Sequence, residues 1–129
     1  VMAPLVWISV IALGLGAAYG AAALVSPSFA ATSVRLQADP ERPGGYAEFR
    51  ATIGGVFFAL HAYALFALLT GGASGPALTV AAGWIGAAIG RGTAIALDGN
   101  HAINPGYNAK LIGLELVFAL AIAAPLLQA

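Results

Sequence analysis

Charged residues and cysteine are what this sequence has least of. Its 129 residues include five acidic and five basic side chains and no cysteine. Without cysteine the chain forms no disulfide, holds no metal through thiolates and has no thiol nucleophile. The charged fraction is 8%, against about 25% in soluble domains, which is too little to cover a water-soluble fold. The net charge is zero, and no basic patch is available to bind nucleic acid.

Catalytic motifs are missing as well. The sequence contains no HExxH motif, no phosphate-binding loop and no Ser/His/Asp pattern. Gly90-Arg91-Gly92 lies inside an apolar run rather than between a strand and a helix. We therefore expect a non-enzymatic protein with no catalytic residue, no metal site and no cofactor, although a bound lipid is compatible with the composition.

Long apolar runs, in contrast, make up most of the chain. A helix of about 20 apolar residues crosses the roughly 30 Å hydrocarbon core of a bilayer, and the alternation typical of strands is absent. The sequence predicts an all-α integral membrane four-helix bundle that forms a single domain over residues 1–129. The four transmembrane helices are expected at about 2–25, 49–70, 77–97 and 110–127, with a polar loop at 26–48. A signal peptide is the alternative for the first run, but its length and the lack of a basic start favour a retained helix.

The charged residues all fall in loops 26–48 and 98–109 or in the adjoining half of the helices. The positive-inside rule would place these loops in the cytoplasm and both termini on the other side. Acidic residues nearly balance the basic ones in the same loops, which weakens this assignment of orientation.

Several of these charges are expected at one depth inside the membrane. Arg91 and Glu115 each lie five or six residues inside the same boundary, which corresponds to roughly 8–9 Å. Asp98 follows Arg91 by two helical turns on the same face, and Glu48 and Arg50 enter this layer from the second helix. Because ionisable groups within a span usually face the interior and pair, we predict one intramembrane polar cluster of these five residues.

The role of that cluster stays open at the level of sequence. Arg91 alone could extend to the head groups, but Glu115 is too short to do so, which favours pairing. The pair would then either hold two helices together or form part of a pocket for an anionic lipid head group or a small solute.

Two GxxxG patterns mark candidate packing faces. They are Gly16 to Gly20 in the first apolar run and Gly86 to Gly90 in the third. Small residues let helix backbones approach closely in lipid, so these four glycines are predicted helix-packing residues. Packing within the bundle is favoured over packing against a neighbouring protein.

His61 lies near the middle of the second run, beside aromatic residues. A neutral imidazole at this depth could ligate the magnesium of a chlorophyll or the iron of a haem. However, the second histidine, His101, lies in a predicted loop, and Phe57 stands where light-harvesting proteins usually have a small residue. A histidine hydrogen-bonded within or between helices is the favoured interpretation.

Two short motifs resemble a known family. Residues 50–55, reading RATIGG, resemble an Arg-x-x-x-Gly-Gly motif, and residues 90–99, reading GRGTAIALDG, resemble a Gly-Arg…Asp-Gly motif. Both are found in small bacterial four-helix integral membrane proteins of unknown function that are distantly DoxX-like. The resemblance implies the four-helix fold and a multi-pass place in a bacterial inner (cytoplasmic) membrane. It singles out Arg50, Gly54, Gly55, Arg91, Asp98 and Gly99.

The sequence favours a non-enzymatic accessory or structural subunit of a larger bacterial inner-membrane complex, such as a respiratory or photosynthetic one. Its partners would be membrane lipids and other membrane-protein subunits. The alternative is a small membrane carrier or binding protein for a lipid, a quinone or another hydrophobic ligand, with Arg91 and Glu115 at the mouth of its cavity.

Overall fold

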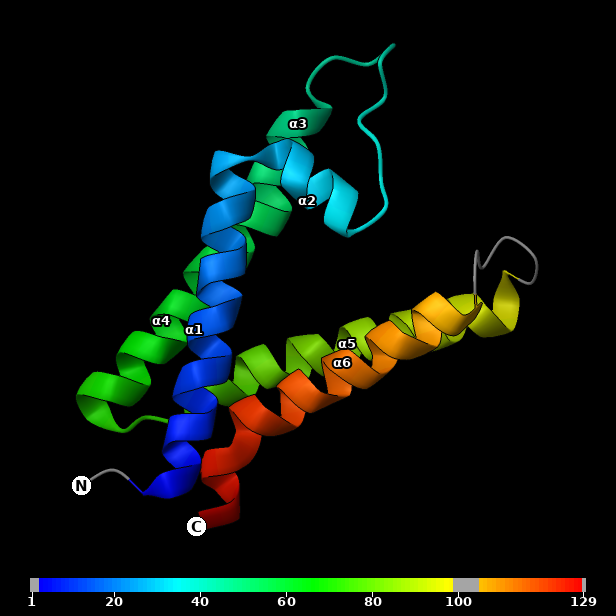
Figure 1. Ribbon diagram of the computed structural model, residues 1–129. Helices are drawn as coiled ribbons and strands as arrows, with labels where there is room; N and C mark the ends of the chain where they lie inside the picture. The colour runs from blue at the N-terminus through cyan, green and yellow to red at the C-terminus, as the bar shows by residue number, and fades with distance from the viewer. Residues whose placement is uncertain (1–2, 99–104, 129) are drawn as a thin grey trace.

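The computed structural model describes residues 3–98 and 105–128, and these residues form helices with no strand among them (Figure 1). The helices are α1 (Pro4–Val25), α2 (Pro27–Ser33), α3 (Gly45–Glu48), the π-helix η1 (Phe49–Val56), α4 (Phe57–Gly71), α5 (Gly75–Leu97), α6 (Pro105–Ala123) and the 3₁₀ helix η3 (Ala124–Gln128). Four continuous stretches of 22 to 27 residues are long and apolar enough to span a membrane: Pro4–Val25, Gly45–Gly71, Gly75–Leu97 and Gly106–Leu127. The all-α fold class with four candidate transmembrane helices is therefore confirmed.

The polar segment 26–48 is not a plain loop, because it contains α2 and α3. Ser26 caps α2 by accepting a hydrogen bond from the Phe29 backbone N–H. Pro27 occupies the first helical position, where the backbone N–H that proline lacks would have no partner within the helix. α2 then buries Ala30 and Ala31 against neighbours that include Phe49. The second long helix consequently begins at Gly45, four residues before the predicted start.

The four long helices form two hairpins that meet at one end and diverge at the other. α1 pairs with η1 and α4, and α5 pairs with α6 (Figure 1). Near the chain termini all four helices share a buried apolar core: Ala12, Leu13, Ala64, Leu68, Ala77, Val80, Ala81 and Ile122. The buried hydroxyl of Ser9 in α1 donates a 2.8 Å hydrogen bond to the carbonyl oxygen of Ile122 in α6. This end holds the hairpins together, and the space between them widens toward segment 26–48.

The hairpin of α1 and α4 depends on glycines. A Cβ atom at Gly20 would overlap the backbone of Phe58, and one at Gly16 would overlap the ring of His61. At Gly54 a Cβ would lie 2.9 Å from the Leu24 backbone nitrogen. At Gly20 and Gly54 the two backbones therefore touch without intervening side chains, and at Gly16 the His61 ring fills the space that a Cβ atom would take.

The GxxxG pattern in α5 has a different role. A Cβ atom at Gly86 or Gly90 would meet nothing within 4 Å, and both residues are exposed. The favoured expectation that this pattern packs within the bundle is therefore wrong, because α5 turns a different face, including Ala77, Ala81 and Ala88, into the protein.

This difference gives a matched prediction. Gly20→Ala should lower the free energy of unfolding by about 1–3 kcal/mol, because the added methyl group forces α1 away from the Phe58 backbone. Gly86→Ala should be neutral or slightly stabilising, because alanine is the better helix former and has open space here. Unfolding of both variants in the same detergent measures this. Equal effects at the two glycines would contradict the assignment of packing faces.

Candidate functional site between the hairpins

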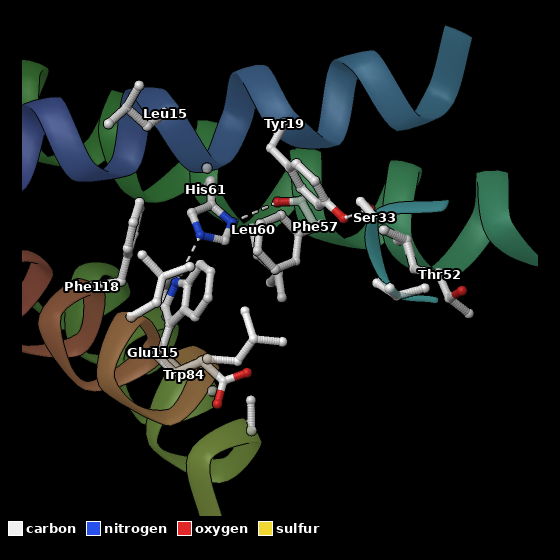
Figure 2. A pocket seen from close by; sticks show the side chains of 18 of the residues that line it. Leu15, Tyr19, Ser33, Thr52, Phe57, Leu60, His61, Trp84, Glu115 and Phe118 are labelled. Atoms are coloured by element: carbon white, nitrogen blue, oxygen red, sulfur yellow. Dashed lines mark hydrogen bonds between the residues drawn. The ribbon is translucent and has the colours of Figure 1, made fainter. Parts of the chain in front are cut away.

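A cavity of about 680 Å³ occupies the space where the hairpins diverge. Its wall is contributed by α1, α2, η1, α4, α5 and α6, so both hairpins face it. Figure 2 shows side chains from these elements around the cavity, with Tyr19 and Ser33 toward one end and Phe118 toward the other. The lining is mainly apolar, with a few polar groups at separate depths.

The deep part of the cavity is aromatic. The ring of Trp84 stacks on Phe118 with centroids 4.8 Å apart, and it meets Phe57 edge to face at 5.4 Å. Phe57 in turn meets Tyr19 edge to face at 5.5 Å. Offset and edge-to-face contacts of this kind hold rings in fixed orientations, so this wall is pre-formed.

His61 is built into that wall by two hydrogen bonds. Its Nδ1 lies 2.8 Å from the carbonyl oxygen of Phe57, which can only accept, so Nδ1 carries the proton. Nε2 therefore has the lone pair, and it accepts a 3.2 Å hydrogen bond from the indole N–H of Trp84 (Figure 2). Both ring nitrogens are thus engaged.

This geometry argues against the haem or pigment ligand considered for His61. Ligation would require Nε2 to release Trp84, which would leave a partly buried indole N–H unpaired. His101 lies outside the described residues. Within 3–98 and 105–128 no group of three or more His, Cys, Asp or Glu side chains could hold a metal ion.

His61→Leu should therefore destabilise the protein by about 1–3 kcal/mol, because the Trp84 N–H loses its acceptor. In a Trp84→Phe background, where no donor is left unpaired, the same change should cost clearly less. Unfolding of the two single variants and the double variant in detergent gives this comparison. If the two effects simply added, the His61–Trp84 hydrogen bond would have no energetic weight.

Arg91 and Glu115 form an ion pair in the wall nearer the diverging end. Arg91 Nε donates to Glu115 Oε1 at 2.6 Å, and Arg91 Nη1 lies 3.5 Å from Asn108 Oδ1. The Glu115 side chain is 5% exposed and the Arg91 side chain 30%. Both residues line the cavity. The second carboxylate oxygen of Glu115, Oε2, is covered by protein atoms and has no hydrogen-bond partner in the described part of the chain.

The structure does not bring the other three predicted cluster members to this pair. Arg50 instead donates to the carbonyl oxygens of Leu24 and Val25 at the end of α1, where a cation satisfies otherwise free carbonyls. Glu48 and Asp98 are exposed. The expectation of a single five-residue cluster is wrong for two reasons. The hairpins diverge, which separates Glu48 and Arg50 from Arg91 and Glu115, and Asp98 lies at the exposed end of α5.

The Arg-x-x-x-Gly-Gly motif thus has a structural explanation of its own. Arg50 caps α1 while Gly54, one turn later in η1, packs against Leu24. Both residues hold the end of α1 to the second long helix. Gly99, from the other motif, lies outside the described residues.

Sequence reasoning missed the contribution of α2, which closes the diverging end of the cavity. Tyr19 in α1 and Ser33 in α2 are joined by a 2.6 Å hydrogen bond between their hydroxyls. Across the cavity, Tyr107 in α6 donates to the Ser33 carbonyl oxygen at 3.4 Å, and the Arg35 guanidinium lies 3.6 Å from the centre of the Tyr107 ring. The Ser26-Pro27 helix start was the signal in the sequence that could have located α2.

The sides of the cavity remain open between these two closed ends. Leu15, Leu60 and Leu114 line it from three different helices, and each is about half exposed. When the long helices span a bilayer, these leucines lie where acyl chains would be. A molecule dissolved in the membrane therefore has a lateral route into the cavity.

Fold and site together indicate a multi-pass helical membrane protein with a laterally open cavity between its two hairpins. Comparison with models of protein families, with curated proteins and with solved structures found no match. The DoxX-like resemblance stays a prediction carried by the two motifs.

Proposed function

We propose that this chain is a small, non-enzymatic membrane carrier or binding protein for a hydrophobic ligand, such as a lipid or a quinone, in a bacterial inner membrane. The observation that carries the proposal is the cavity of about 680 Å³ between the hairpins. Ligand pockets typically measure about 300–1,000 Å³ and combine an apolar lining with a few placed polar groups. This cavity matches that description in both respects.

The polar groups of the cavity support binding rather than catalysis. His61 is engaged at both nitrogens, and Arg91 is paired with Glu115. Groups that already hydrogen-bond to one another can orient a ligand without activating it. The lateral openings at Leu15, Leu60 and Leu114 favour a ligand that arrives through the membrane.

Purification in a mild detergent followed by native mass spectrometry tests the proposal. We expect one tightly held lipid-like molecule per chain, with an identity enriched over its share of the total membrane lipid. Extraction and analysis of the bound fraction identifies it. A chain that carries no such molecule, or carries bulk lipids in their ordinary proportions, would contradict the proposal.

A second candidate function is favoured by the exposed glycines of α5. We propose that Gly86 and Gly90, which no part of the described chain covers, form a contact with another subunit of a larger inner-membrane complex. Small residues on an outer helix face permit close helix approach. Affinity purification from native membranes should recover a stoichiometric partner with the wild type and lose it with Gly90→Leu, while Ile85→Leu on the same helix retains it. Recovery of the same proteins by all three would contradict this role.

A further inference from the structure

The unpaired oxygen of Glu115 indicates what kind of head group the cavity accepts. Glu115 is 4% exposed and lines the cavity, and Oε2 has no donor among the described residues. A buried carboxylate oxygen that lacks a donor is costly, and a ligand that supplies one relieves that cost. Because Oε2 itself is covered, the carboxyl group has to turn before a molecule in the cavity can reach it, and that molecule should then present an O–H or N–H group.

The charge of the site further narrows the class of ligand. The charged residues that line the cavity are Arg91 and Glu115, and they neutralise one another. An anionic head group would lie next to the Glu115 carboxylate, and a cationic one next to the Arg91 guanidinium, where like charges repel. A neutral head group that carries a hydrogen-bond donor avoids both repulsions.

The other lining residues favour a ligand whose apolar part lies deeper along the helices than its head group. Trp84 lies seven residues before Arg91 on α5, which places the aromatic wall roughly 10 Å deeper along the helix. Between them the cavity is lined by groups such as Ala87 and Leu114 that offer no side-chain hydrogen bond. A chain or ring system can lie there while its head group reaches Glu115.

We infer that the cavity binds a neutral lipid with a free hydroxyl group, which donates its hydrogen bond to Glu115 Oε2 once that carboxyl group turns toward the cavity. The inference rests on the proposed binding function and names the ligand class. It replaces the anionic head group considered from the sequence.

Quenching of Trp84 fluorescence gives a direct test. The chain has two tryptophans, so Trp7→Phe leaves Trp84, which lines the cavity, as the only indole. Dibrominated stearyl alcohol and dibrominated stearate quench an indole on contact and differ only in the head group. At a pH that keeps stearate ionised, we expect the alcohol to bind about ten- to hundredfold more tightly, the range expected for one charge-assisted hydrogen bond.

The decisive variant is Glu115→Gln, which keeps the shape of the side chain and leaves Arg91 as an uncompensated cation. The preference should then invert, with stearate binding at least as tightly as the alcohol. Inversion is not expected if Glu115 only supports the fold. A circular dichroism spectrum like that of the wild type shows that the variant has retained its helices.

The other outcomes separate this inference from the proposed function. Tighter binding of stearate by the wild type would overturn the inference while leaving a hydrophobic ligand in place. Equal quenching by both probes would mean that ordinary acyl chains fill the cavity, and it would also overturn the inference. Failure of both probes to quench Trp84 would contradict the proposed function itself.

Discussion

Replacing Arg91 with alanine is expected to lower the free energy of unfolding by about 3 kcal/mol. The change leaves the Glu115 carboxylate, whose side chain is 5% exposed, without the cation that pairs with it. Breaking a buried ion pair from one side typically costs about 3–5 kcal/mol, and the 30% exposure of Arg91 favours the lower end of that range. Reversible unfolding in a detergent that keeps the protein helical measures this loss.

Two further variants distinguish a pair from two independent residues. Glu115→Gln should cost less than Arg91→Ala, because Arg91 is 30% exposed and keeps part of its hydration without a partner, whereas the 5% exposed Glu115 carboxylate does not. The double variant Arg91→Met with Glu115→Leu should be close to the wild type in stability, because neither charge remains buried. Additive losses in the double variant would contradict the pairing energy that we assign here.

Filling the cavity is expected to abolish ligand binding without unfolding the protein. Gly83 lines the cavity, and a Cβ atom there would meet nothing within 4 Å. A phenylalanine at this position can therefore extend into the space that the ligand occupies. Gly83→Phe should weaken binding of dibrominated stearyl alcohol by at least about tenfold, corresponding to about 1.4 kcal/mol or more.

Gly86→Phe on the same helix is the matched control. It makes the same change of side chain at an exposed glycine that does not line the cavity, and it should bind the probe like the wild type. Binding that survives in both variants would show that the ligand lies elsewhere. Loss in both variants would show that a bulky residue in α5 disturbs the whole helix.

The helices were predictable from the sequence because crossing a bilayer requires length and apolarity, which composition alone reveals. The ion pair of Arg91 and Glu115 was predictable for a related reason, since consecutive antiparallel helices bring residues of equal depth together. Arg50 has a similar depth but belongs to the other hairpin, and nothing in the sequence shows that the two hairpins separate. The same limit applies to the cavity, which is a consequence of that separation.

The two GxxxG patterns illustrate a second limit. Gly20 and Gly86 occur in equivalent motifs, yet only Gly20 has a helix against it. A motif of small residues shows that a close approach is possible but does not identify the neighbour. The partner is decided by which face of each helix the rest of the chain covers.

Nuclear magnetic resonance of the arginine side-chain N–H groups, recorded in lipid bicelles, tests most directly whether Arg91 is held between the helices. With no cysteine to oxidise and only four arginines, the spectrum is simple, and Arg91→Lys assigns the signal. We predict that the Arg91 Nε–H exchanges slowly with water and shifts downfield through its hydrogen bond to Glu115, and that both effects vanish in Glu115→Gln. Arg42, whose side chain is 88% exposed, is the internal reference for rapid exchange. An Arg91 signal that exchanges as fast as that of Arg42, in the wild type, would contradict the account.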